Sequence, residues 1–353
     1  MVNDLTDDFE RIHVLSLPEL MVLILGASEP PRGVVSTRWE DADWQLGSFA
    51  RAAVARLKKS NYRSPSAQSV YEYLRSNGGS DAPLTRDSDW VSYLRQLPDF
   101  EKARGLRAHA ALLSVIGTTL ARHRSLSDIS HVIIDEAQDV TPLEWFLLEA
   151  INDGTWTLLG DLNQRRSDHN LFSWQQVLEV LDLTEVDMPI RRLERGYRST
   201  RPILEYANRL LPRAERAVLA FQDSGPTPRV TRVRDSELGS TVDAEVRRLL
   251  REYPSGTHAV ITPRFSDVRQ WLRRLGWAMH DRNVELWEFN GRVVRVVGPN
   301  AARGLEYDAV VVVEPTEFPR NLGRQGPLYT SLTRANRELS IIHTKQLPDA
   351  LRR

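Results

Sequence analysis

Two adjacent carboxylates follow a short apolar run near the middle of the sequence. The run at 131–134, His-Val-Ile-Ile, predicts a buried parallel strand, because apolar residues without alternation are typical of strands covered by helices on both faces. Asp135 and Glu136 come directly after this run. Ligands of open α/β sheets lie at the carboxyl ends of the strands, so the position suits a magnesium-bound nucleotide. Asp135 would hold the Mg²⁺ ion and Glu136 would orient an attacking water, which makes both of them candidate catalytic residues.

The residues after these carboxylates also have a purely local interpretation. Asp139 and Thr141 precede Pro142, and a polar residue before a proline is a common start of a helix. This helix-cap interpretation accounts for Thr141 as well as a functional role does. It does not explain why four polar residues of the segment 135–139 follow a fully apolar strand.

A glutamine follows the next apolar run. The residues at 155–161, Thr-Trp-Thr-Leu-Leu-Gly-Asp, predict a second parallel strand, and the helix expected at 142–151 completes a βαβ unit. Gln164 comes just after this strand and would sense a phosphate or the water at the same sheet edge. A glutamine in a turn is more often a plain loop residue. Its pairing with Asp135 and Glu136 is what favours the functional role.

The rest of the chain supplies the elements that must position these residues. A strand and a helix are expected within 10–26, and residues 42–125 are expected to be mostly helical. The apolar side chains on one helical face of that block are Trp44, Phe49, Val54 and Leu57. Later in the chain, strands are expected at 258–262, 293–297, 309–315 and 339–343, and helices at 201–211, 238–253, 265–275 and 328–336. We therefore predict an α/β protein of two parallel-sheet units, joined near residues 184–196.

The composition narrows the class of protein. Its 353 residues are 41% hydrophobic, enough for two buried cores, and the formal net charge is zero, so any nucleic-acid surface must be local. The absence of cysteine excludes thiolate metal sites, and the eight histidines lack metal-ligand spacing, so a metal ion would be held by oxygen. No run approaches the roughly 20 apolar residues of a membrane-spanning helix. The start carries Asp4, Asp7 and Asp8 in place of a basic signal segment, so we expect a soluble, cytoplasmic protein.

Five segments resemble helicase motifs and occur in helicase order. DEAQD at 135–139 looks like motif II, and GDLNQ at 160–164 looks like motif III, of UvrD/Rep-type superfamily 1 helicases. LERGYRS at 193–199, ARGLEYD at 302–308 and LYTSLTRA at 328–335 resemble motifs IV, V and VI. The forms GDLNQRR, VVVVEP and GPLYTSLTRA are most similar to HelD, the RNA polymerase-associated branch. The resemblance covers residues 126–345 and implies two RecA-like units with helices on both faces, the first incomplete and carrying a helical insertion.

The resemblance also implies roles in nucleotide binding for motifs IV to VI. Tyr197 would stack near the base or ribose, while Arg198 and Arg334 would be the two cations that reach the γ-phosphate. Guanidinium groups suit this task, because phosphoryl transfer is catalysed by positioned cations. Glu306 would contact the nucleotide sugar, and Gly304 would permit the close turn that brings it there. Replacement of Arg334 by alanine is expected to abolish turnover and leave the fold intact.

Two further residues are candidates for contacts with nucleic acid. Trp174 follows motif III at a place where the family often has an aromatic residue that stacks on a base. The stretch LFSWQQVLEVL around it also reads as an amphipathic helix, in which Trp174 would be a core residue. Arg303 takes the place of the family lysine in motif V, where Asn300 and Gly298 replace the usual histidine and threonine.

One motif of the family is missing from these residues. A phosphate-binding P-loop reads G-x-x-x-x-G-K-[ST]. The sequence has no Gly-Lys pair, because its four lysines, Lys58, Lys59, Lys102 and Lys345, follow Leu, Lys, Glu and Thr. In the family the P-loop strand lies beside the strand of motif II, so we expect an exposed strand edge that another segment must cover. Only about 100 residues separate motifs IV and V, which is too few for the second inserted domain of the unwinding enzymes.

The sequence leaves competing hypotheses. In the first, residues 1–125 are a remnant of the first motor domain with a helical insertion, 126–195 are the rest of that domain, and 196–353 are the second. This motor would use ATP and Mg²⁺ to act on nucleic acid, with single-stranded DNA the foremost choice, or on RNA polymerase, and a partner chain would carry the P-loop. In the alternative, the chain is a non-catalytic helicase-like module that binds DNA, RNA polymerase or a nuclease partner. A truncated product without a function of its own is the third hypothesis, and no membrane partner is expected.

Overall fold

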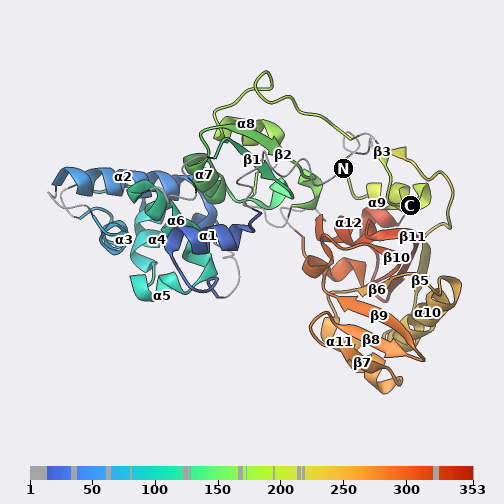
Figure 1. Ribbon diagram of the computed structural model, residues 1–353. Coiled ribbons are helices and arrows are strands. Elements are labelled where there is room, and N and C mark those ends of the chain that lie inside the picture. Colours follow the sequence, from blue (N-terminus) through green and yellow to red (C-terminus); the bar gives the residue numbers. More distant parts are fainter. Residues whose placement is uncertain are drawn as a thin grey trace, which may run out of the picture. The chain divides into compact units, whose positions relative to one another are not determined.

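The computed structural model describes most of the chain (Figure 1). The described residues are 14–32, 38–60, 65–79, 82–121, 126, 129–165, 170–171, 173–193, 195–212, 216, 219–320 and 326–352. The chain divides into two compact units, and the first comprises Met1–Gly160 and His169–Pro189. The second comprises Asp161–Asp168 and Ile190–Arg353. The passage at Pro189 lies inside the predicted junction at 184–196, but residues 161–168, which the sequence placed in the first motor domain, group with the second unit.

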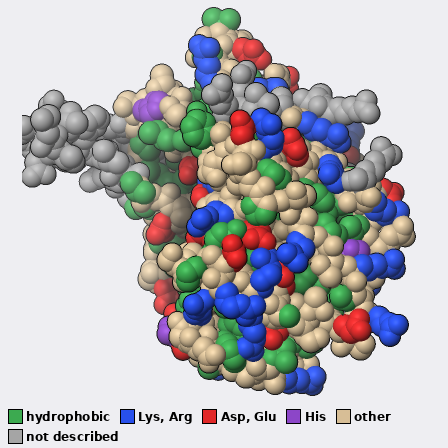
Figure 2. Space-filling view, turned by 90° about the vertical axis from the view of Figure 1, so that its right-hand side faces the viewer, with side chains coloured by type: hydrophobic (Ala, Val, Ile, Leu, Met, Phe, Trp, Pro, Cys, Tyr) green, Lys and Arg blue, Asp and Glu red, His purple; other side chains and the backbone are tan. Residues whose placement is uncertain are grey.

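The surface is mixed in charge. On the face drawn in Figure 2, acidic and basic side chains are interspersed, as the formal net charge of zero would suggest. Among the residues that the structure describes, none of the helices has the length and apolar character needed to cross a membrane.

The first unit is built mainly from helices. Its helices are α1 (Leu17–Leu25), α2 (Trp44–Ser60), α3 (Ala67–Arg75), α4 (Ser88–Gln96), α5 (Phe100–Arg104), α6 (Arg107–Leu120), α7 (Pro142–Ile151) and α8 (Trp174–Val180). The predicted helical face of α2 is confirmed: Phe49 and Val54 are buried, and Trp44 and Leu57 pack against the same core. Of the strand and helix expected at 10–26, the helix is α1, and residues 10–13 lie outside the described residues.

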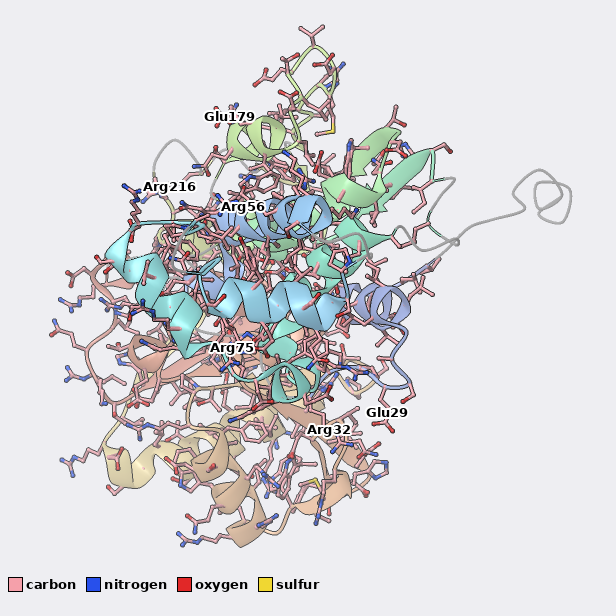
Figure 3. The ribbon with its side chains drawn as sticks, turned by 90° about the vertical axis from the view of Figure 1, so that its left-hand side faces the viewer. Glu29, Arg32, Arg56, Arg75, Glu179 and Arg216 are labelled. Carbon is pink, nitrogen blue, oxygen red and sulfur yellow. The ribbon has the colours of Figure 1, made fainter. Side chains whose placement is uncertain are left out.

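Arginines on α2 and α3 donate hydrogen bonds to the segments that connect the helices of this block. Arg56 donates to the carbonyl oxygen of Ala82 at 2.6 Å. Arg75 donates through Nε to the carbonyl oxygen of Leu97 at 3.0 Å, and both arginines are labelled in Figure 3. These groups satisfy backbone carbonyls where the chain turns between helices.

Two parallel strands complete the first unit. β1 (His131–Ile134) pairs with β2 (Thr155–Leu158), and α7 connects them as predicted. The prediction that these strands are buried on both faces is wrong. Side chains alternate between half-buried and exposed along both strands, and Ile133 is 66% exposed. The reason is that the apolar core lies against only one face, where Ile134 and Leu158 contact it.

The second unit is built around a seven-stranded sheet. Its order is β5 (Arg229–Arg232), β11 (Ala335–His343), β10 (Tyr307–Val313), β6 (His258–Ile261), β9 (Arg292–Val297), β8 (Leu286–Phe289) and β7 (Ala278–Asp281). The first five strands of this order run parallel, and β8 and β7 add an antiparallel hairpin at one edge. The four strands predicted from sequence are β6, β9, β10 and β11, whereas β5, β7 and β8 were not predicted.

Helices cover both faces of this sheet. α9 (Arg201–Asn208) and α12 (Gly326–Leu332) pack on one face, and α10 (Leu238–Glu252) and α11 (Phe265–Arg274) pack on the other (Figure 1). β6 is therefore buried along its whole length, and its side chains alternate between the two cores. This confirms the predicted α/β class. The helix expected at 328–336 is shorter than predicted, because β11 already begins at Ala335.

Candidate functional site

The acidic pair of the first unit lies at the carboxyl end of β1. Asp135 and Glu136 are both exposed, and Asp135 Oδ1 accepts a hydrogen bond from the Glu136 amide at 2.8 Å. Glu136 has a φ of +53°, in the left-handed region that residues other than glycine seldom adopt. Such backbone strain persists only where neighbours enforce it, and it is often found at functional sites. Here the Ala137 amide donates to the Leu159 carbonyl at 2.8 Å and holds the turn against the end of β2.

Gln138 supports this turn and was not among the predicted site residues. Its side chain is buried, and its Nε2 donates to the Glu136 carboxylate. Its backbone carbonyl accepts from Asn170 Nδ2 at 2.8 Å. A Cβ atom on Gly160 would lie 2.4 Å from Gln138 Oε1, so a larger residue there would displace the Gln138 side chain. Gln138 and Gly160 therefore keep the Glu136 carboxylate in place.

The helix-cap interpretation of Thr141 is confirmed. Thr141 Oγ1 accepts from the Glu144 amide at 3.3 Å, and the Glu144 carboxylate accepts from the Thr141 amide at 3.0 Å. This reciprocal pair is the capping box that starts α7. Thr141 needs no functional role, whereas Asp135 and Glu136 lie outside the cap.

The acidic pair suits a magnesium ion that is shared with a ligand. No cluster of three or more acidic, histidine or cysteine side chains able to hold a metal occurs in the described ranges. Mg²⁺ is commonly held by one or two carboxylates together with water and substrate phosphates, so a complete protein cage is not required. The exposed carboxylate of Asp135 provides an oxygen ligand of this kind.

In the second unit, Gln164 and Arg334 are in direct contact. The Gln164 amide oxygen accepts from Arg334 Nη2 at 3.0 Å, and its Nε2 donates to Asp161 Oδ2 at 2.9 Å. Gln164 belongs to the short 3₁₀ helix η5 (Leu162–Gln164). Its two hydrogen bonds leave the amide group in one orientation, with the oxygen toward the guanidinium.

Arg334 is buried and held from several sides. It is 3% exposed, and its Nε donates to the Thr330 carbonyl at 3.1 Å. Its Nη1 donates to the Leu305 carbonyl at 3.3 Å. In the preceding helix α12, burial raises the pKa of Tyr329 well above its usual range, and the Asp161 carboxylate adds to this. The guanidinium is therefore fixed where the segments before β10 and β11 meet.

Arg198 and Glu306 form an ion pair beside this cluster. Both side chains are partly open to solvent, at 46% and 42% exposure. Gly304 has a φ of +67°, so the chain turns sharply just before Glu306. The Leu305 carbonyl accepts a hydrogen bond from Arg334, and the Glu306 carboxylate pairs with Arg198. The two arginines therefore contact neighbouring residues of one segment. The structure thus brings Gln164, Arg198, Glu306 and Arg334 together within the second unit.

The remaining predicted site residues have different surroundings. Tyr197 is 65% exposed, and its ring lies 5.1 Å from that of Phe221, which sequence reasoning missed. Trp174 is the first residue of α8 and is half-buried against the core of the first unit, which favours the core interpretation. Arg303 donates to the Arg165 carbonyl at 2.9 Å and so fastens the segment that carries Gln164.

Comparison with known proteins gives partial matches to DNA helicases. No protein-family model matches the chain. The ATP-dependent DNA helicase UvrD2 of Mycobacterium tuberculosis is 32% identical over an alignment of 130 residues that covers 33% of this chain and 18% of that protein. The ATP-dependent DNA helicase srs2 of Schizosaccharomyces pombe is 31% identical over an alignment of 87 residues that covers 23% of this chain and 9% of that protein. The chain is helicase-like.

The helicase-like chain spans less than a fifth of each of these curated relatives. Among solved structures, the C-terminal domain of a possible DNA helicase from Lactobacillus plantarum has a TM-score of 0.33 and 24% identity. That alignment covers 45% of the helicase-like chain and 93% of the other. The PRRSV helicase has a TM-score of 0.35 and 17% identity, with coverage of 79% and 46%. Likenesses this distant say nothing about the site.

Proposed function

We propose that this chain is the motor portion of a UvrD-type superfamily 1 helicase, closest to the HelD branch. It couples ATP binding and hydrolysis to movement on nucleic acid, or to remodelling of a complex bound to nucleic acid. The observation that carries the proposal is the convergence of Gln164, Arg198, Glu306 and Arg334 in the second unit. These residues come from four separate segments of the sequence, and a structural role alone gives no reason for the exposed pair Arg198 and Glu306 to lie beside them.

The cluster has the chemistry that phosphoryl transfer needs. Arg198 can exchange its partly exposed partner Glu306 for a phosphate oxygen, since a guanidinium binds carboxylate and phosphate in the same geometry. Arg334 is held rigidly, which suits a cation that neutralises charge in the transition state. In the first unit, Asp135 would hold Mg²⁺ and Glu136 would orient the attacking water. Bound Mg²⁺ would neutralise charge on the phosphates.

The phosphate-binding loop must be supplied from outside these 353 residues. The sequence has no Gly-Lys pair, so none of its lysines can take the P-loop position. We propose that residues 1–125 hold the remnant of a first RecA-like domain with a helical insertion, and that a P-loop-bearing segment or partner chain completes it. The exposed face of β1 and β2 is in keeping with a sheet that lacks a covering layer on one side.

The proposed partners are nucleic acid and RNA polymerase. Single-stranded DNA is the first choice, because the curated relatives are DNA helicases by name. RNA polymerase is the choice that the HelD-like forms of motifs III and VI favour. Acidic and basic side chains are interspersed on the face drawn in Figure 2, so either partner would bind at a local surface.

Turnover measurements test the motor hypothesis. We expect no hydrolysis of Mg-ATP by the chain alone, with or without single-stranded DNA, and hydrolysis once a P-loop-bearing partner is added. Glu136→Gln should then abolish the restored rate, because the amide cannot act on the attacking water as the carboxylate does. Turnover by the isolated chain would overturn the assignment of the P-loop to another segment.

The second candidate is a non-catalytic helicase-like module that binds DNA, RNA polymerase or a nuclease partner. The missing Gly-Lys pair favours it. The same measurements separate the two functions. A chain that binds DNA or polymerase, and that no P-loop-bearing partner activates, is a binding module.

A further inference from the structure

The two compact units differ strongly in charge. The first contains 16 lysines and arginines against 26 aspartates and glutamates, whereas the second contains 31 against 21. The formal net charge of zero is therefore the balance of −10 on the first unit and +10 on the second. A domain with such a basic excess attracts polyanions, while an acidic domain repels them. A nucleic acid that binds this chain should therefore find its phosphate contacts on the second unit.

Three exposed arginines of the second unit keep their charge available. Arg251 lies in the last turn of α10, and Arg273 and Arg274 are the last two residues of α11. Among the residues that the structure describes, none forms an ion pair with these three arginines. The Arg273 guanidinium lies 5.5 Å from the centre of the Trp287 ring, a contact that positions the group and leaves its charge uncancelled.

The ends of these two helices meet at the amino-terminal edge of the sheet. Arg247 in α10 donates to the carbonyl oxygen of Leu275, directly after α11, at 3.1 Å. Its guanidinium also lies 3.5 Å from the centre of the Phe289 ring, at the end of β8. Arg292, which starts β9, donates to the Leu250 carbonyl in the last turn of α10. These contacts join three segments, namely the last turns of both helices and the β8–β9 turn.

Part of this basic charge has a structural explanation. Arginine near the end of a helix stabilises the negative end of the helix dipole. Arg247 and Arg292 do so directly, because each donates to a carbonyl oxygen at a helix end. Within the described chain, Arg251, Arg273 and Arg274 donate to no carbonyl oxygen. Three exposed cations therefore remain beyond those that cap the helices.

The surroundings of these cations favour a phosphate backbone over an acidic protein. None of the exposed large hydrophobic side chains of the described residues lies in the three segments. A protein interface has a buried apolar centre, which this surface does not supply. Small residues that permit close approach stand there instead, namely Ser255, Gly256, Gly276 and Gly291. Contact with phosphates requires cations and close approach, and both are present.

We propose that Arg251, Arg273 and Arg274 form a contact surface for the phosphate backbone of nucleic acid. The inference deepens the proposed function, because it takes nucleic acid as the partner and assigns it a contact outside the five motifs. Backbone contacts carry no sequence information, and the three segments expose no large ring on which a base could stack. Single strands and duplexes should therefore depend on these arginines alike.

Binding of nucleic acid to the full chain at several salt concentrations tests this assignment. The probes are a fluorescein-labelled oligo-dT strand and a mixed-sequence duplex of the same length, and fluorescence anisotropy measures the affinities. In the variant Arg251→Gln/Arg273→Gln/Arg274→Gln, both probes should bind about tenfold or more weakly at ~0.1 M salt. The slope of log affinity against log salt concentration should become shallower by about one per arginine, because each lost phosphate contact releases fewer counterions.

Two matched variants separate the lost charge from other effects. Replacement of the same three arginines by lysine retains the charge and should keep the salt slope of the unchanged chain. Arg86→Gln/Arg95→Gln/Arg104→Gln removes equal charge from exposed positions of the first unit, and it should change affinity by less than about twofold because salt screens distant charges. ATP and inorganic tripolyphosphate should bind all variants equally, because Arg198 and Arg334 are unchanged.

The possible failures are distinct. If the glutamine variant binds both probes as tightly as the unchanged chain and with the same salt slope, the contact surface is wrong and the proposed function stands. An equal loss in the lysine and glutamine variants would show that charge is not what the partner reads, and would also overturn the inference. If the glutamine variant loses a polyglutamate peptide but keeps both nucleic-acid probes, the surface serves an acidic protein. If the unchanged chain binds neither probe at low salt, this inference fails together with the proposed nucleic-acid partner, whereas binding of ATP tests the motor chemistry separately.

Discussion

At the scale of single residues, Arg334 joins a proposed chemical role to an observed structural one. It is buried and donates to the Thr330 and Leu305 carbonyls and to Gln164. Arg334→Ala should abolish partner-dependent turnover and also lower the free energy of unfolding by about 1–3 kcal/mol, because buried acceptors lose their donor. Urea unfolding of the variant measures the second effect. From the sequence we expected this substitution to leave the fold intact, because the burial of Arg334 could not be read from the sequence.

A companion variant separates the two roles of Arg334. Gln164→Ala removes one acceptor of the guanidinium and leaves its two carbonyl partners. Its stability should change by less than about 1 kcal/mol, while turnover should still fall if Gln164 positions the phosphate or the water. Equal turnover in Gln164→Ala and the unchanged chain would remove Gln164 from the site.

The candidate site residues that the sequence singled out are those with unusual chemistry at a strand end or in a motif. Asp135 and Glu136 became candidates because they follow an apolar strand, and Gln164 because it follows the next strand and pairs with them at the same sheet edge. Gln138 and Phe221 were missed because their importance comes from a partner that only the fold supplies. Gln138 contacts Glu136 across a strained turn, and Phe221 meets Tyr197 through strand pairing.

At the scale of elements, a charged network joins the loops that follow the parallel strands of the second unit. Arg264, after β6, makes a bidentate pair with Glu317 at 2.7–2.9 Å, and Lys345, after β11, reaches the same carboxylate at 2.6 Å. Arg264 also contacts Asp235 at 2.9 Å. The Arg264 guanidinium, with a smaller contribution from Lys345, lowers the pKa of Glu317 from 4.5 to about 2.

Because of this network, the second unit should lose stability as the pH becomes acidic. A carboxyl with a lowered folded-state pKa stabilises the fold fully above its unfolded pKa of 4.5, and the stabilisation is lost as the pH falls toward 2. Glu317→Gln should therefore be less stable at pH 7 by roughly 1–2 kcal/mol, and the difference should shrink between pH 4.5 and 3. Urea midpoints across this range measure it. Glu252→Gln on the exposed side of α10 should show no such trend, and a pH-independent difference for Glu317→Gln would contradict the assignment.

Close packing between α2 and α7 predicts that an alanine in place of a helical glycine will destabilise the protein. A Cβ atom on Gly47 would lie 2.7 Å from the Phe146 ring. That ring cannot retreat easily, because Trp44 packs edge-on at 4.5 Å and the Arg51 guanidinium lies 4.0 Å from its centre. Glycine to alanine normally stabilises a helix, but Gly47→Ala should destabilise the first unit by about 1–3 kcal/mol. Gly105→Ala, where the nearest atom is 3.7 Å from the added Cβ, is the control and should be neutral or slightly stabilising.

The elements that the sequence predicted best are strands whose side chains are buried on both faces of the sheet. β6 and β10 read as unbroken apolar runs because helices cover both sides of the sheet. β8 and β9 form a hairpin across Asn290 and Gly291, both with positive φ, and this Asn-Gly signal was available in the sequence. The exposed face of β1 could not be predicted in the same way, since an apolar run does not reveal how many strands and helices surround it.

At the scale of the whole molecule, the chain passes between its two compact units more than once. Residues 161–168 leave the first unit, join the second, and are followed by 169–189 of the first. The passage back to the second unit lies between Pro189 and Ile190. The exposed segment with Arg191 and Arg192 after that passage is therefore one of several connections. A single cut there would leave part of the second unit on the amino-terminal fragment.

This arrangement predicts how the chain behaves when it is cut. A protease recognition sequence inserted between Arg191 and Arg192 would yield two fragments, and the amino-terminal one would carry Gln164 and Arg165. Arg165 is buried within the second unit, its carbonyl accepts from Arg303, and Gln164 accepts from Arg334. The fragments should therefore elute together from a size-exclusion column after cleavage, and separate at lower urea when Gln164→Ala is introduced. Immediate separation of the cut fragments without denaturant would show that residues 161–168 do not hold to the second unit.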